Sequence, residues 1–360
     1  MGIPVKRLDV VDVCGNSRQM GRSHGEQRRD QIASDLQQLD ELAARWGARR
    51  QSVLECFGVF KPMFEHVAPA LIDEMLGVAE GAGRSFDEIL FLNARHGGIE
   101  ALEAGRTPTA ACTSFAVGGD GAAATGMWAG QTKDTPRASL NRYYLLRTKP
   151  TAGSRVLVLN YPGEVGQIGI GSHGVAVFSN GLFPRRRWLG GPHNLARRAM
   201  LESASVDEAG SVLSRLDRWC EANYLVADST GRSACFEILG GRVRRVDPIE
   251  HIITHANHAV SADLLGEEDF ADRQAQSTAR AVRLDHLLRQ QHGNLTWQLC
   301  ARTLSDHEHE PQSICRHGAV VQKLEKLFTT CALIADIANR SLHVCLGNPC
   351  QVPFEAYGFD

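Results

Sequence analysis

The chain has 360 residues, of which 43% are hydrophobic and 22% charged, and its formal net charge is −2. This ordinary globular composition supplies enough apolar material for one large or two ordinary domains. Because charges of both signs are mixed along the chain, the sequence indicates neither a nucleic-acid partner nor a membrane surface. No signal-peptide core or long apolar segment is present, so we expect a soluble, cytoplasmic protein.

The first hundred residues are predicted to be mainly helical after a short strand over 8–13. Apolar residues recur at the three- and four-residue spacing of an amphipathic helix over 32–46 and again over 71–79. Residues 87–95 predict a third helix.

Strands predominate after 105–109, a breaker-rich loop that we expect to expose the peptide bond before Cys112. Strands are predicted over 113–117, 125–132, 155–160, 167–170, 175–179, 224–227, 234–238 and 252–255, a hairpin over 331–337 and 341–346, and helices over 195–213 and 277–290. Short connections rich in Gly, Asp and Asn favour antiparallel pairing. The order predicts an α+β sandwich with helices outside antiparallel sheets.

Ten cysteines are scattered through the chain, and none of them forms a C-x-x-C pair. A small disulfide framework, a zinc knuckle and a thioredoxin-type site are therefore not predicted. We expect most of these thiols to be reduced, and several to be buried.

Cys112 stands out because it lies where a loop of small residues becomes a strand-like run, Ala110-Ala111-Cys112-Thr113-Ser114-Phe115. A thiolate nucleophile needs a base or positive groups nearby. The α-amine of the cysteine itself is one such base, since its pKa lies closer to neutrality than that of a lysine. That amine exists only if the Ala111–Cys112 bond is cut, for example by attack of the thiol on the preceding carbonyl.

Several motifs occur in an order that resembles a known family. They are Gly21-x-x-His24-Gly25, Glu80-Gly81-Ala82-Gly83, Leu92-Asn93-Ala94-Arg95, Cys112-Thr113-Ser114-Phe115, Gly130-Gln131-Thr132-Lys133-Asp134, Pro162-Gly163-x-x-Gly166, Gly174-Val175-Ala176-Val177-x-x-Asn180-Gly181-Leu182, Thr254-His255-x-Asn257-His258, Asp306-His307 and Pro311-x-Ser313-Ile314-Cys315-Arg316. Over nearly its whole length the chain resembles the acyl-coenzyme A:6-aminopenicillanic acid acyltransferase (isopenicillin N acyltransferase, peptidase C45) family of cysteine N-terminal nucleophile hydrolases.

The resemblance implies a four-layer αββα sandwich of two antiparallel sheets, made as a single-domain precursor of residues 1–360. It further implies self-cleavage into a mainly helical small chain, 1–111, and a large catalytic chain, 112–360. The two chains are expected to stay associated, and association into a homo-oligomer is left open.

The resemblance also assigns roles to individual residues. Cys112 matches the nucleophile, and Asp134 matches the carboxylate that orients the new amine. Asn257 matches an oxyanion-hole donor, while Arg316 matches a cation beside the nucleophile and carboxylate. Asn180 is a candidate for a further polar contact.

Two features depart from the family pattern. Ala111 stands where relatives usually have glycine, and its Cβ restricts the backbone, so we expect slower or conditional processing. The stretch between Cys112 and Asp134 is a few residues longer around 118–121, which should lengthen the first hairpin without moving the site.

Two functions of another class stay open. The run 306–310, Asp-His-Glu-His-Glu, together with His255 and His258, offers zinc ligands, although its spacing matches no helical zinc motif. A metal-dependent hydrolase thus remains one alternative, and a non-catalytic binding protein is the other. We expect no metal and no cofactor.

The favoured function is a self-processing cysteine amidohydrolase that cleaves a small N-acyl or aminoacyl amide through a thioester acyl-enzyme. The runner-up is an acyltransferase that moves an acyl group from coenzyme A or an amide donor to an amine such as 6-aminopenicillanic acid. In both cases the partner is a small-molecule amide or acyl substrate.

Overall fold

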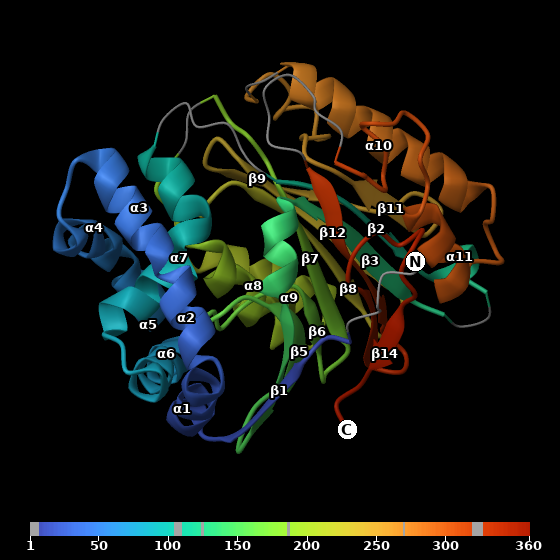
Figure 1. Cartoon of the computed structure of the whole chain (residues 1–360). Helices are drawn as coiled ribbons and strands as arrows, with labels where there is room; N and C mark the ends of the chain where they lie inside the picture. The colour runs from blue at the N-terminus through green and yellow to red at the C-terminus, as the bar shows by residue number, and fades with distance from the viewer. Residues whose placement is uncertain (1–6, 104–109, 124–125, 186–187, 269–270, 319–326) are drawn as a thin grey trace.

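The computed structural model describes residues 7–103, 110–123, 126–185, 188–268, 271–318 and 327–360 (Figure 1). The loop 105–109 lies outside these ranges. The helices are α1 (Ser17–Gln27), α2 (Arg29–Asp35), α3 (Gln37–Trp46), α4 (Arg50–Phe57), α5 (Lys61–Val67), α6 (Pro69–Ala82), α7 (Phe86–Leu102), α8 (His193–Leu201), α9 (Val206–Ser211), α10 (Ala271–Arg289) and α11 (Trp297–Leu304). The strands are β1 (Val10–Gly15), β2 (Ala111–Val117), β3 (Trp128–Thr135), β4 (Tyr144–Pro150), β5 (Val156–Asn160), β6 (Gly169–Gly171), β7 (Val175–Gly181), β8 (Ala222–Asp228), β9 (Ser233–Leu239), β10 (Arg242–Val246), β11 (Ile252–His255), β12 (Phe328–Asp336), β13 (Ser341–Cys345) and β14 (Glu355–Tyr357).

The strands form two sheets. One has eight strands in the order β1-β4-β5-β6-β7-β8-β9-β10, and the other has six in the order β11-β2-β3-β12-β13-β14. Neighbouring strands are antiparallel except for β1, which pairs in parallel with β4 at the edge of the larger sheet. The predicted antiparallel sheets are therefore found with this one exception.

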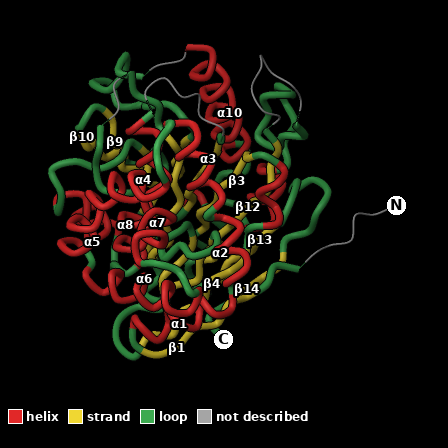
Figure 2. Tube along the Cα trace, turned by 60° about the vertical axis from the view of Figure 1, so that its left-hand side comes forward, coloured by secondary structure: helices red, strands yellow, loops and turns green. Residues whose placement is uncertain are grey.

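Successive side chains of the strands point to opposite faces of the sheets and pack into three large apolar cores. Val158, Val177 and Val226 face helices of the first two hundred residues, whereas Leu157 and Phe178 point the other way, into a core shared with the smaller sheet. A third core joins the outer face of the smaller sheet to α10 and α11. This period-two alternation confirms the predicted αββα order of layers. The helical layer that contains α1 to α7 lies in front of the strands in Figure 2.

Glycines let α1 and α6 approach until their backbones touch. A Cβ on Gly21 would overlap the carbonyl of Glu74, and one on Gly77 would overlap the carbonyl of Arg18. Gly25 and Gly81 repeat this contact one turn along each helix. The motifs that contain these glycines thus have a packing role, because only a residue without a side chain fits between the two backbones.

Some predicted elements differ from those observed. β4, β10, β14 and α11 were not predicted, and the single helix predicted over 195–213 is two helices. Its break lies before Ser205, whose side chain accepts a hydrogen bond from the Glu208 amide and starts α9. The helix predicted over 32–46 is likewise divided, at Leu36, into α2 and α3.

Within the described residues, none of the helices has the length and apolar character needed to cross a membrane.

Candidate active site

Cys112 is the second residue of β2 and lines a cavity of about 450 Å³. Its side chain is half-buried, and Ala111 before it is buried inside the same strand. The expectation that the bond before Cys112 is exposed is therefore wrong, because pairing with β3 draws Ala111 into the sheet. The thiol itself still reaches the cavity.

Asn257 holds the backbone of Cys112. In the β11–β2 ladder His255 pairs with Ser114, so the chain two residues later lies opposite Cys112. There the Cys112 N–H donates to Asn257 Oδ1 at 2.9 Å, while Asn257 Nδ2 donates to the Gly181 carbonyl at 3.1 Å. Asn257, predicted as an oxyanion-hole donor, therefore lies beside Cys112, but its amide oxygen and not its N–H group faces the Cys112 backbone.

Arg280 of α10 joins the same group, and the sequence did not point to it. Its guanidinium donates to Asn257 Oδ1 at 2.8 Å and to Thr113 Oγ1 at 3.0 Å. A helix of the outer layer thereby fixes the start of β2. No motif marks Arg280 in the sequence, since it lies far from Cys112 along the chain.

Asp134 is fully buried in β3, opposite Ala111. Its Oδ1 accepts a hydrogen bond from Thr329 Oγ1 at 2.7 Å, and its Oδ2 lies 3.4 Å from Arg316 Nε. Neither Oδ2 nor Nε has a hydrogen-bond partner among the described residues. Burial raises the pKa of the Asp134 carboxyl, and Arg316 is the largest influence that lowers it.

Asn180 of β7 lies in the wall of the cavity. Its Oδ1 accepts hydrogen bonds from Ser114 Oγ at 2.7 Å and Asn223 Nδ2 at 3.1 Å. Its Nδ2 is buried without a partner among the residues that the structure describes. This residue of the cavity wall therefore has an unused amide donor.

Lys133 is a second residue that sequence reasoning missed, although it lies within the motif that contains Asp134. It pairs with Cys112 in the β2–β3 ladder, and its ammonium lies over the ring of Tyr161, 5.2 Å from the ring centre. Burial lowers the pKa of Lys133, and burial raises the pKa of the Cys112 thiol. The positive charge of Lys133 works against the rise at Cys112 because it favours the thiolate.

The cavity wall carries two arginines as well as the carboxylate of Glu100. Arg197 of α8 donates to neutral acceptors, namely Gln167 Oε1 and Asn194 Oδ1 at 2.8 Å each and the His193 carbonyl at 3.1 Å. Arg142 also lines the cavity, although both oxygens of Asp35 already bind its guanidinium. Lys133 and Arg197 together therefore favour an anionic group in the cavity.

A kink in α7 shapes another wall. His96 and Gly97 leave the helical conformation, and Gly97 has a φ of 90°. A Cβ at Gly97 would lie 2.8 Å from the Cys220 sulfur and 3.0 Å from His193 Nε2, so both the backbone angle and the space require glycine. The kink places His96 and Glu100 along the cavity.

The zinc site considered from the sequence does not assemble. His255 Nε2 lies 2.8 Å from Glu237 Oε1, and His258 Nδ1 lies 2.7 Å from Ser277 Oγ. Among the described residues, neither belongs to a group whose ligand atoms converge as for a metal ion. From the run 306–310 only His307 belongs to such a group, with partners from other segments.

The four αββα layers, built on two packed sheets, are those of the N-terminal nucleophile hydrolase fold. The chain belongs to the acyl-coenzyme A:6-aminopenicillanic acid acyl-transferase family, whose model matches residues 121–351. It is 25% identical, over 346 residues that cover 94% of this chain and 92% of the relative, to the 40 kDa form of acyl-coenzyme A:6-aminopenicillanic-acid-acyltransferase from Emericella nidulans. The predicted family is thereby confirmed.

Two solved structures are also similar. An N-acylethanolamine-hydrolyzing acid amidase ortholog from Caenorhabditis elegans has a TM-score of 0.46 and 13% identity, covering 63% of this chain and 93% of that chain. A mutant of the conjugated bile acid hydrolase from Clostridium perfringens has a TM-score of 0.46 and 11% identity, covering 69% and 97%.

Proposed function

We propose that this protein is a self-processing cysteine amidohydrolase that acts on small N-acyl or aminoacyl amides. The observation that carries the proposal is the position of Cys112. Its thiol lines a cavity of ligand size, its backbone N–H is bound by Asn257, and the buried Asp134 lies across the ladder from the preceding residue.

Self-cleavage would convert residue 112 into the N-terminus of a second chain. The Cys112 sulfur attacks the Ala111 carbonyl carbon, the thiol proton passes to the peptide nitrogen, and the C–N bond breaks so that the nitrogen leaves as the α-amine of Cys112. Water then hydrolyses the resulting thioester, which frees the thiol and leaves a carboxylate on Ala111. The products are the proposed chains 1–111 and 112–360.

Asp134 Oδ2, which forms an ion pair with Arg316 but accepts no hydrogen bond, supports a role for the new amine. A buried carboxylate oxygen without a hydrogen bond is costly, and an ammonium or amine donor formed nearby would satisfy it. Arg316 would keep Asp134 ionised in that state. The amine could then take the thiol proton and later deliver it to the leaving amine of the substrate.

Two amides are candidates for stabilising the tetrahedral oxyanion. Asn257 would have to turn its Nδ2 away from the Gly181 carbonyl, whereas Asn180 already has an unused Nδ2 in the cavity wall. One well-placed donor of this kind contributes about 3 to 4 kcal/mol to the transition state. We propose that both take part, with Asn257 released from Cys112 N once the bond before it is cut.

The cavity also suggests the kind of substrate. Its volume suits a small molecule, and Lys133 and Arg197 favour a substrate with a carboxylate or another anionic group close to the scissile amide. Acyl transfer to an amine is the second candidate, because the Emericella nidulans relative is named as an acyltransferase. Water and an amine would compete for the same thioester.

Intact-mass spectrometry of purified wild type and Cys112→Ala tests the proposal. We expect one wild-type fragment ending at Ala111 and another beginning at Cys112, and only the full-length chain in the variant. An uncut wild type that hydrolyses amides would rule out the free-amine mechanism.

Product analysis with N-acyl amides, with and without an added amine, then separates hydrolysis from transfer. Release of the free acid is expected. Formation of a new amide from a coenzyme A thioester would instead support the acyltransferase.

A further inference from the structure

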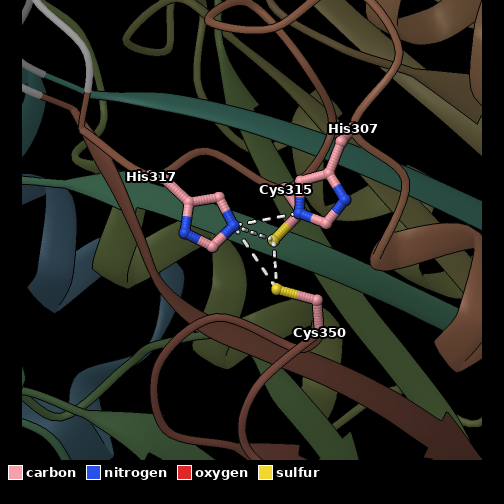
Figure 3. Close-up of side chains that lie close together, drawn as sticks. All are labelled: His307, Cys315, His317 and Cys350. Carbon is pink, nitrogen blue, oxygen red and sulfur yellow. Dashed lines mark hydrogen bonds between the residues drawn. The ribbon is translucent and has the colours of Figure 1, made fainter.

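Four metal-binding side chains from three segments converge outside the cavity. His307 follows α11, Cys315 and His317 precede β12, and Cys350 follows β13. Their ligand atoms all lie within 4.8 Å of one another, and Figure 3 shows the four side chains pointing toward a common centre. None of the four lines the cavity beside Cys112. The cluster is therefore unused by the proposed amide chemistry.

Four of the six distances within the cluster lie near the edges of a tetrahedron around one zinc ion. Zinc bonds of about 2.3 Å to sulfur and about 2.0 to 2.1 Å to nitrogen imply edges of about 3.8 Å (S to S), 3.6 Å (S to N) and 3.3 Å (N to N). The Cys315 and Cys350 sulfurs are 3.7 Å apart, and the two histidine Nε2 atoms are 2.9 Å apart. His317 Nε2 lies 3.7 Å from the Cys315 sulfur and 3.3 Å from the Cys350 sulfur.

Neither a disulfide nor apolar packing accounts for the cluster as well as a metal ion does. A disulfide between Cys315 and Cys350 needs sulfurs about 2.05 Å apart, far closer than the observed distance. Packing of apolar residues fails because Cys350 is exposed and two imidazole nitrogens face each other. Two thiols and two imidazoles are instead a ligand set that zinc prefers.

We propose that His307, Cys315, His317 and Cys350 bind one Zn²⁺ in a closed, structural site. Four protein ligands leave no coordination position for substrate or water, which distinguishes this site from a catalytic zinc centre. On binding, the two thiols release their protons to solvent and coordinate as thiolates. The exposed Cys350 leaves a path by which the ion enters.

The site would also anchor Arg316, which lies between two of the ligands in the chain. Asn348 Nδ2 donates to the Cys315 sulfur at 3.3 Å and to the Arg316 carbonyl at 2.8 Å. The Arg316 N–H donates to Thr329 Oγ1 at 2.8 Å, the same hydroxyl that donates to Asp134. A bound ion would thus hold the segment that places Arg316 beside Asp134.

The test is elemental analysis of protein purified without a metal-affinity step, and it requires no substrate. We expect about one zinc per chain in the wild type, and zinc affinity weaker by at least about tenfold in Cys350→Ser and His317→Ala. Cys14→Ser and His309→Ala are matched controls, because Cys14 and His309 are exposed residues outside the cluster, and both should keep the ion.

Cobalt substitution and thermal unfolding give independent readouts. Co²⁺ should give the visible bands of a tetrahedral thiolate site in the wild type and lose them in Cys350→Ser. A chelator should lower the melting temperature of the wild type and leave that of Cys350→Ser unchanged. The proposal is overturned by zinc-supplemented wild type without bound metal, by a Cys315–Cys350 disulfide in freshly purified protein, or by unchanged zinc affinity in both ligand variants.

Discussion

Replacing Arg316 by methionine should destabilise the protein in a pH-dependent way. Arg316 and Asp134 are both buried, and Nε lies 3.4 Å from Oδ2. At an effective dielectric constant of about 20, two unit charges at this separation attract each other by about 5 kcal/mol. Removing one partner leaves a buried charge uncompensated, so we expect a loss of about 3 to 5 kcal/mol in the free energy of unfolding.

The sign of the pH dependence follows from Asp134. Without Arg316 the pKa of its carboxyl rises further above its ordinary value, because burial is no longer opposed by the nearest cation. A carboxyl with a raised pKa binds its proton more tightly in the folded state, so its contribution to stability is lost as the pH rises through the folded pKa. Arg316→Met should therefore cost more at pH 8 than at pH 5.

Urea unfolding of Arg316→Met at both pH values, with zinc content checked, measures the effect. Arg244→Met is the control, because Arg244 Nη2 lies 2.6 Å from Asp263 Oδ2 but both side chains are half-exposed, and its loss should cost less than about 1 kcal/mol. The double variant Asp134→Asn, Arg316→Met should recover part of the stability. A cost below about 1 kcal/mol for Arg316→Met, equal at the two pH values, would refute the reasoning.

Three further predictions concern other parts of the molecule. Lys133→Met should shift alkylation of Cys112 to higher pH, because the thiolate loses the cation that lowers its pKa most. Peptide mapping after iodoacetamide treatment at several pH values measures this shift, and an unchanged pH profile contradicts it. Burial lowers the pKa of His24 to about 3, so the unfolded state takes up that proton first as the pH falls below about 6.5. The free energy of unfolding should then fall by about 1.4 kcal/mol for each unit by which the pH is lowered. Urea unfolding of His24→Gln should show a weaker dependence of this free energy on pH. Gly77→Ala should lower the free energy of unfolding by about 1 to 3 kcal/mol, because its Cβ meets the Arg18 backbone. Gly58→Ala has open space around its Cβ, so thermal unfolding should show unchanged or slightly raised stability.

Much of the fold could be predicted from periodicity. The pattern over 71–79 became α6, and alternating residues between short turns became most strands of both sheets. β10 was not predicted because it is an edge strand of arginines and valines, whose arginine side chains form ion pairs with residues such as Asp263. β4 was not predicted because most of its residues are buried, so apolar and polar residues do not alternate along it.

The candidate site, too, could be predicted only in part from the sequence. Cys112, Asp134, Asn180 and Asn257 lie on or next to strands that pair with or pack against one another, and their motifs drew attention to them before any geometry was known. Lys133 was hidden within such a motif, because only the ladder register shows that it stands opposite Cys112.

The sequence by itself predicted helices outside antiparallel sheets and a cysteine at the start of a strand, because these depend on residue types at short, fixed spacings. The family and its four-layer order followed from motifs that occur in the same order along nearly the whole chain. Only the tertiary structure decided which distant residues lie around that cysteine and which side chains form the zinc cluster. Arg280 reaches Asn257 from a distant helix, and the thiols of Cys315 and Cys350 become neighbours through the β12–β13 hairpin. Contacts between residues far apart in the chain depend on how sheets and helices pack, which no local pattern encodes.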